Sequence, residues 1–146
     1  MVKTMSKRDM TNRTVRACRT EFTTREEGED FIIEGYFAVF NSNYEIFDGA
    51  TESIDSHAFD ETLQNDDVRA LINHDTTLVL GRTKAGTLNL EVHPNRGLWG
   101  RIRINPNDSD AMNIRARVLR GDVDQCSFGF DILDEPGWQA YAPCVN

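Results

Sequence analysis

Apolar and polar residues alternate along much of this chain with a period of two, which is typical of β-strands. The clearest case is LWGRIRI, where Leu98, Ile102 and Ile104 fall on one face and Arg101 and Arg103 on the other. Residues 31–40, FIIEGYFAVF, are rich in the β-branched and aromatic residues that favour strands. Further strands are expected at residues 14–23, 68–73, 78–83, 87–92 and 123–132. The pattern therefore predicts about seven strands.

Two segments have the spacing and end signals of helices. SHAFDETL begins with Ser56, a good N-cap residue, and would start a short helix there. Residues 105–122 contain a longer helix, which Asp108 or Ser109 can cap and which Gly121 can end. Its expected apolar stripe is Ala111, Met112, Ala116, Val118 and Leu119.

Short turns join most of the expected strands. Residues 25–30, REEGED, read as a hairpin loop, residues 93–97, HPNRG, as another, and the polar residues 41–50 as a surface loop. A parallel, doubly wound sheet would need a helix between most strands, and the pattern contains two helices in all. The pattern therefore favours a mainly β fold (α+β), an antiparallel or mixed β-barrel of about seven strands with helices on its outside.

Length and charge limit the function classes. The 146 residues are enough for one domain, expected at residues 14–133, with a flexible N-terminus at 1–13 and an atypical tail at 134–146. A net charge of −8 argues against nucleic-acid binding, although arginines crowd the second half and leave a local basic face open. No apolar segment is long enough to span a membrane, and no secretory signal is apparent. Three cysteines at wide spacings, Cys18, Cys126 and Cys144, indicate a reducing compartment rather than a disulfide framework.

Three histidines are candidates for chemistry. His74 follows a short apolar strand and precedes Asp75, a position where a rigid sheet can hold a catalytic group, although a local turn role is the alternative. For His57, in the expected first helical turn, a surface role is favoured, and for His93, in the hairpin loop, a turn role. Their spacing matches no compact metal-ligand motif, so no metal and no cofactor is expected.

Ser127 lies in the stretch QCSFGFDI, where alternation places Ser127, Gly129 and Asp131 on one face and Cys126 and Phe128 on the other. Ser127 is either a solvated strand residue or a nucleophile, and a nucleophilic serine needs a base within hydrogen-bond reach. His74 is the best-placed base. Cys126 is the rival nucleophile, but its phenylalanine neighbours favour a thiol buried in the core.

Taken in order, these segments resemble those of the prohead serine proteases of tailed bacteriophages. The matching pieces are FIIEGYFAVFN, TESIDSHAFDETL, LINHDTTLVLGRT, RGLWGRIRI and VLRGDVDQCSFGF, with the histidine segment before the serine segment. The resemblance covers about residues 14–133.

The resemblance implies an assemblin-like β-barrel and serine peptide hydrolysis, with His74 as general base and Ser127 as nucleophile. Arg82 in the GRT segment, together with Gly129, is a candidate for oxyanion or substrate binding. The implied substrates and partners are the scaffold domain of the major capsid protein and the protease itself, in a likewise implied homo-oligomer. The implied location is the assembling procapsid in the host cytoplasm.

The family's third catalytic group is an acid well past the serine, and no matching segment is found here. Asp134 and Glu135 stand too early in the chain for that role. A truncated gene product, an acid from a neighbouring subunit, or a chain that no longer cleaves would each explain this. Two other classes of function remain open: a non-catalytic capsid-assembly or scaffold-binding protein, and a metal-dependent hydrolase that uses the three histidines.

Overall fold

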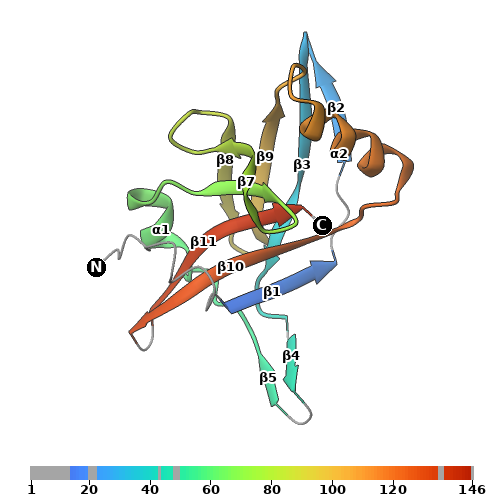
Figure 1. The fold of residues 1–146 in the computed structure, drawn as a ribbon. Helices are drawn as coiled ribbons and strands as arrows, with labels where there is room; N and C mark the ends of the chain where they lie inside the picture. The colour runs from blue at the N-terminus through green and yellow to red at the C-terminus, as the bar shows by residue number, and fades with distance from the viewer. Residues whose placement is uncertain (1–13, 20–22, 43, 48–49, 135–136, 146) are drawn as a thin grey trace.

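The computed structural model describes residues 14–19, 23–42, 44–47, 50–134 and 137–145. These residues form eleven strands and two helices (Figure 1). In chain order the elements are β1 (Thr14–Arg19), β2 (Thr23–Glu27), β3 (Asp30–Val39), β4 (Tyr44–Phe47), β5 (Ala50–Glu52), α1 (Asp60–Asn65), β6 (Arg69–Ile72), β7 (Asp75–Arg82), β8 (Leu88–His93), β9 (Gly97–Ile104), α2 (Ser109–Arg120), β10 (Gln125–Asp134) and β11 (Gly137–Val145). The expected mainly β fold with two helices is confirmed, but the expectation of about seven strands is wrong, because the described residues form eleven, several of them short.

The described strands form three sheets. One has the order β1-β10-β11-β6-β7, a second has the order β2-β3-β9-β8, and β4 and β5 form a separate hairpin. All pairs are antiparallel except β11 with β6. In Figure 1 the long β10–β11 pair crosses the molecule beneath β3 and β9, while the β4–β5 hairpin projects away from the body.

A single closed barrel, as expected from the strand pattern, is not found among the described strands. The ladder is interrupted between β7 and β8, where Arg82 and Thr87 instead close a tight turn through a hydrogen bond from the Thr87 N–H to the Arg82 carbonyl (3.2 Å). Gly81 allows this turn to lie close, because a Cβ at Gly81 would stand 2.8 Å from the Thr87 carbonyl oxygen. The two large sheets therefore remain open at this corner.

The core joins the two large sheets. Phe37 is fully buried at a bulge in β3, where the register with β9 shifts between Tyr36 and Ala38. Its ring occupies the space that a side chain at Gly100 would fill, since a Cβ there would lie 2.0 Å from Phe37 Cε2. The Cys126 thiol of β10 donates to the Tyr36 carbonyl (2.9 Å) at the same bulge. One bulge thus ties β3 of the second sheet to β10 of the first.

The longer helix begins and ends as its sequence predicts. The Asp108 carboxylate accepts a hydrogen bond from the Asp110 N–H (3.0 Å), and Gly121 ends the helix in the left-handed conformation with φ 85°. The buried face is Ala111, Ile114 and Val118, whereas Leu119, expected in the stripe, is 57% exposed. No helix in the described part of the chain is long and apolar enough to cross a membrane.

The shorter helix starts later than expected. Ser56 to Phe59 form a turn, and α1 begins at Asp60 without a side-chain cap. The competing interaction comes from Asp55, whose carboxylate accepts from the His57 N–H (2.8 Å) and whose carbonyl accepts from the Ala58 N–H (3.0 Å). An aspartate turn of this kind replaces the first helical turn that Ser56 would have capped.

Three other boundaries also differ from expectation. The expected single strand at 14–23 is divided between β1 and β2, and the expected surface loop at 41–50 contains most of the β4–β5 hairpin. The expected strand at 78–83 begins earlier, at Asp75. The segment 134–146, atypical in sequence, supplies β11 and places it between β10 and β6.

Candidate functional site

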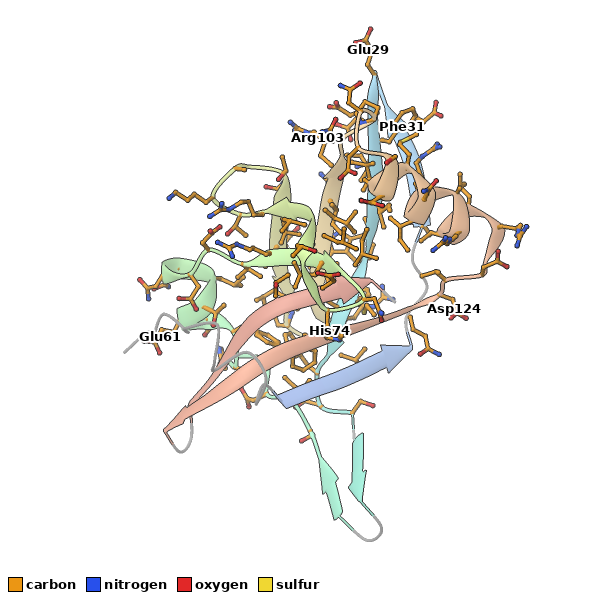
Figure 2. All side chains as sticks on the ribbon, viewed as in Figure 1. Glu29, Phe31, Glu61, His74, Arg103 and Asp124 are labelled. Atoms are coloured by element: carbon orange, nitrogen blue, oxygen red, sulfur yellow. The ribbon has the colours of Figure 1, made fainter. Side chains whose placement is uncertain are left out.

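His74 occupies a sharply defined position in the hairpin between β6 and β7 (Figure 2). Ile72 pairs with Asp75, so the loop is the two residues Asn73 and His74, with φ of 50° and 57°. Two positive φ values identify the type I′ turn that fits the twist of a hairpin. Asparagine tolerates this conformation well, and glycine rather than histidine is the usual second residue. The turn therefore holds a half-buried His74 in a backbone conformation that histidine adopts at a cost.

Bulges next to the turn reshape β7. Leu71 pairs with Val79 and Ile72 with Asp75, so residues 76–78 have no counterpart on β6. Asp75 Oδ1 stabilises this bulge by accepting from the Thr77 N–H (2.9 Å) and the Thr77 hydroxyl (2.6 Å). These hydrogen bonds, the hydroxyl first, lower the pKa of Asp75. Bulges of this kind recur beside active sites, where they change the direction of a strand.

Ser127 lies near the start of β10, inside the five-stranded sheet. Its backbone pairs with Ala17 of β1 on one side and Cys144 of β11 on the other. The flanking Cys126 and Phe128 are 0% and 1% exposed, so the expectation of a core thiol at Cys126 is confirmed. The side chain of Ser127 lies outside the part that the structure describes. The backbone nevertheless fixes the position of Ser127 within the sheet.

The sheet register relates the serine strand to the histidine turn. Leu71 of β6 pairs with Cys144 of β11, and Cys144 pairs with Ser127. Neighbouring strands lie about 4.8 Å apart, so the backbones of Leu71 and Ser127 are separated by roughly 10 Å. His74 follows Leu71 by three residues, in the turn at the end of β6. One strand, β11, thus lies between the elements that carry the two expected catalytic residues.

Arg82 and Gly129 stand in different surroundings. The Arg82 guanidinium forms an ion pair with Asp67, with Nε 3.2 Å from Oδ1 and a closer contact from Nη2 to Oδ2, which raises the pKa of Arg82 and lowers that of Asp67. The Lys84 N–H also donates to Asp67 (3.1 Å). Gly129 is buried in β10 opposite Ala142, and the register between β10 and β11 shifts directly after it. The ion pair with Asp67 was not apparent from the sequence, because the two residues lie 15 positions apart.

Asp134, one of the two acids considered in the sequence analysis, lies far along the strand from Ser127. Asp134 pairs with Gly137 at the β10–β11 turn, seven residues beyond Ser127, or roughly 20 Å along an extended strand. Glu135 lies outside the described residues. Asp134 is therefore distant from Ser127 along β10, and the third catalytic group stays unassigned.

The three histidines lie on separate elements. His57 Nδ1 is 2.9 Å from Asp60 Oδ2, and this hydrogen bond raises the pKa of His57. His93 Nδ1 is 2.7 Å from the Tyr36 hydroxyl, and its ring stacks on Trp99 with centroids 5.9 Å apart. Among the described residues, no group of three His, Cys, Asp or Glu side chains could hold a metal ion. The arrangement gives the metal-dependent alternative no support.

Comparison with protein families decides the classification. Residues 19–143 match the family of caudovirus prohead serine proteases. This chain belongs to that family. The match includes both the His74 turn and the Ser127 strand, and it continues into β11. The comparisons with curated proteins and with solved structures gave no match.

Proposed function

We propose that this chain is the serine endopeptidase of a phage prohead, which cleaves the scaffold domain of the major capsid protein and itself during capsid maturation. Membership in the prohead serine protease family supports this function. The proposed place of action is the assembling procapsid in the host cytoplasm, in a homo-oligomer with the capsid protein as partner. The proposed fold is an assemblin-like barrel, in which the two open sheets represent the two halves of the wall.

In the proposed mechanism, Ser127 Oγ attacks the scissile carbonyl carbon while His74 accepts the hydroxyl proton. His74 then returns this proton to the leaving amine, and water cleaves the acyl-enzyme by the same two steps. Because Cys126 and Phe128 are buried and side chains alternate along a strand, the mechanism assigns Ser127 to the outward face of β10. An imidazole that extends from the turn across β11 would approach that outward face.

The developing oxyanion requires donors aimed at it, each worth about 3–4 kcal/mol in known cases. The sequence candidates are Gly129 and Arg82. Arg82 is the weaker of the two, because its guanidinium is engaged by Asp67 and its N–H donates to the Thr87 hydroxyl (2.9 Å). We therefore assign Arg82 a positioning role, in which the ion pair fixes the end of β7.

The observation that carries the proposal is the shared sheet. The sequence resemblance places the histidine segment before the serine segment, and pairing of β6, β11 and β10 brings Leu71 and Ser127 to within two strand spacings. The orienting acid remains to be identified. In triad proteases, loss of that group lowers the rate by about 10⁴-fold without removing nucleophile or base.

Active-site labelling tests the proposal. A fluorescent phosphonate that reacts with activated serines is expected to label the wild-type chain, and Ser127→Ala and His74→Ala are expected to abolish labelling. Cleavage of the phage capsid protein, followed by mass spectrometry, should show the same dependence. Labelling or cleavage by Ser127→Ala at the wild-type level would exclude Ser127 as the nucleophile. Binding of capsid protein without labelling would favour the non-catalytic assembly role.

A further inference from the structure

Most of the arginines that the structure describes are neutralised by carboxylates. One that is not, Arg117, lines a hollow between α2 and the segment that leads into β10. Nine arginines have described side chains, and seven pair with Asp or Glu: Arg25, Arg69, Arg82, Arg101, Arg103, Arg115 and Arg120. Among the described residues, Arg96 and Arg117 have no carboxylate within ion-pair distance. Arg96 instead lies over the Tyr36 ring, 4.8 Å from its centroid.

Arg117 faces an open hollow of about 610 Å³ at the end of α2. The residues that line it are Asn113, Ala116, Arg117, Arg120, Asp122 and Val123. Arg120 is committed to Asp122, with Nε 2.6 Å from Oδ2. The hollow therefore combines one uncompensated guanidinium, one side-chain amide and an apolar wall from Ala116 and Val123.

A helix C-terminus disfavours an anion, but the end of α2 is capped. The N–H groups of Asp122 and Val123 donate to the Arg117 carbonyl (3.0 and 3.3 Å), and the Gly121 N–H donates to the Val118 carbonyl (3.1 Å). These bonds satisfy two of the last-turn carbonyls that would otherwise repel negative charge. A planar guanidinium that is free of a protein carboxylate can bind one from outside through two parallel hydrogen bonds.

The hollow is close to the candidate nucleophile along the chain. Val123 precedes Ser127 by four residues, and Figure 2 shows Asp124 on the segment that leads from α2 into β10. Four extended residues span at most about 14 Å, which is also the reach of four residues of an extended peptide. A peptide whose scissile bond is at Ser127 would thus bring a residue about four positions away to this hollow.

We infer that Arg117 and its hollow form a specificity subsite for an acidic side chain of the peptide substrate, within about four residues of the scissile bond. The inference rests on the proposed function, since it takes Ser127 as the reaction centre. The net charge of −8 repels acidic peptides in general. Recognition of such a peptide therefore depends on a local cation that none of the described carboxylates neutralises.

Peptide binding to the Ser127→Ala chain tests the subsite without requiring turnover. The probes are fluorescein-labelled ten-residue peptides, neutral except for one Glu or Gln that is moved through successive positions. At the best position, the Glu peptide is expected to bind about ten-fold more tightly than its Gln counterpart, and Arg117→Gln should remove this preference. Arg117→Glu should favour a Lys peptide instead.

The matched control is Arg96→Gln, which removes an equally uncompensated charge at the opposite end of β3, and it should preserve the preference. If Arg96→Gln and Arg117→Gln lose the preference for Glu over Gln equally, the effect is general electrostatics and the inference is wrong. The inference is also wrong if the preference persists in Arg117→Gln. Cleavage of mixed peptides by the wild-type chain separates the two proposals. If the wild-type chain cleaves peptides with and without acidic residues equally well, the protease function is supported and the subsite is refuted. If peptides bind in an Arg117-dependent way but none is cleaved, the subsite is supported and the protease function is refuted.

Discussion

The left-handed conformation of His74 predicts an unusual order of stabilities. We consider His74→Gly and His74→Ala, which remove the same imidazole and differ by one methyl group. At φ 57° an alanine retains the steric cost of the left-handed region, about 1–2 kcal/mol, which glycine does not have. Glycine loses about 0.4–1 kcal/mol more backbone entropy on folding. The glycine variant should therefore be more stable by about 1 kcal/mol, the reverse of the order at an ordinary helix or strand position.

Urea unfolding, monitored by tryptophan fluorescence, gives the free energy of unfolding of each variant. Both variants lack the imidazole, so the loss of its interactions cancels when the two are compared. Both variants should lose peptide cleavage by at least about 100-fold, as expected for loss of a general base. Asn73→Gly is the control, since it changes the other positive-φ residue of the turn and keeps the imidazole; it should retain cleavage. An alanine variant as stable as the glycine variant would refute the turn assignment, and cleavage by either would refute the catalytic one.

Three further predictions concern packing and ionisation. Gly100→Ala should destabilise the fold by about 2–3 kcal/mol through its clash with the Phe37 ring, and Phe37→Leu in the same chain should recover part of the loss in urea unfolding. Asp67→Asn should cost about 1 kcal/mol at pH 7. Because the folded-state pKa of Asp67 is lowered from its ordinary value of 3.8, this difference from wild type should begin to decrease near that value and be lost as the pH falls through the folded-state pKa. The pKa of His57 should lie above 6.5 in an NMR titration, and it should fall in Asp60→Asn. Because this pKa is raised in the folded state, the interaction of His57 with Asp60 stabilises the fold below pH 6.5, and this stabilisation is lost as the pH rises through the folded-state pKa.

Local patterns predicted the elements whose signals are complete within a few residues. The alternation of residues 98–104 gives β9 its buried Leu98, Ile102 and Ile104 and its exposed arginines. The cap at Asp108 and the glycine at 121 define α2 within a residue. In each case the backbone conformation is decided by neighbours in sequence, so pattern reasoning had the information it needed.

Local sequence patterns did not predict how strands from distant segments pair. The β4–β5 hairpin arises in a polar segment without alternation, and β11 arises in a tail whose composition suggested no strand. The division into two open sheets depends on the bulges in β3 and β7 and on the tight turn at Thr87. A strand's partner and register are decided by the whole fold, and a single sequence carries little trace of them.

In the candidate site, too, local features were predictable and contacts between distant segments were not. The position of His74 just past a strand was predictable, whereas its left-handed backbone and the bulge held by Asp75 were not. The role of Arg82 changed most, because the partner that engages its guanidinium lies 15 residues earlier and carries no recognisable motif. In the sequence Arg117 is one of several arginines, and it becomes distinct only when its neighbours Arg115 and Arg120 are seen to be paired with carboxylates.

The place of β11 between β6 and β10 has a consequence for the order of synthesis. A ribosome makes β6 and β10 before residues 137–145, so a nascent chain cannot yet align the histidine hairpin with the serine strand. The parallel pairing of Leu71 with Cys144 then closes a loop of more than seventy residues, a slow kind of step in folding. A newly made chain would thus pass through an interval in which both candidate catalytic segments exist but are not yet assembled. Such a delay would suit the proposed maturation protease, whose proposed substrate surrounds it.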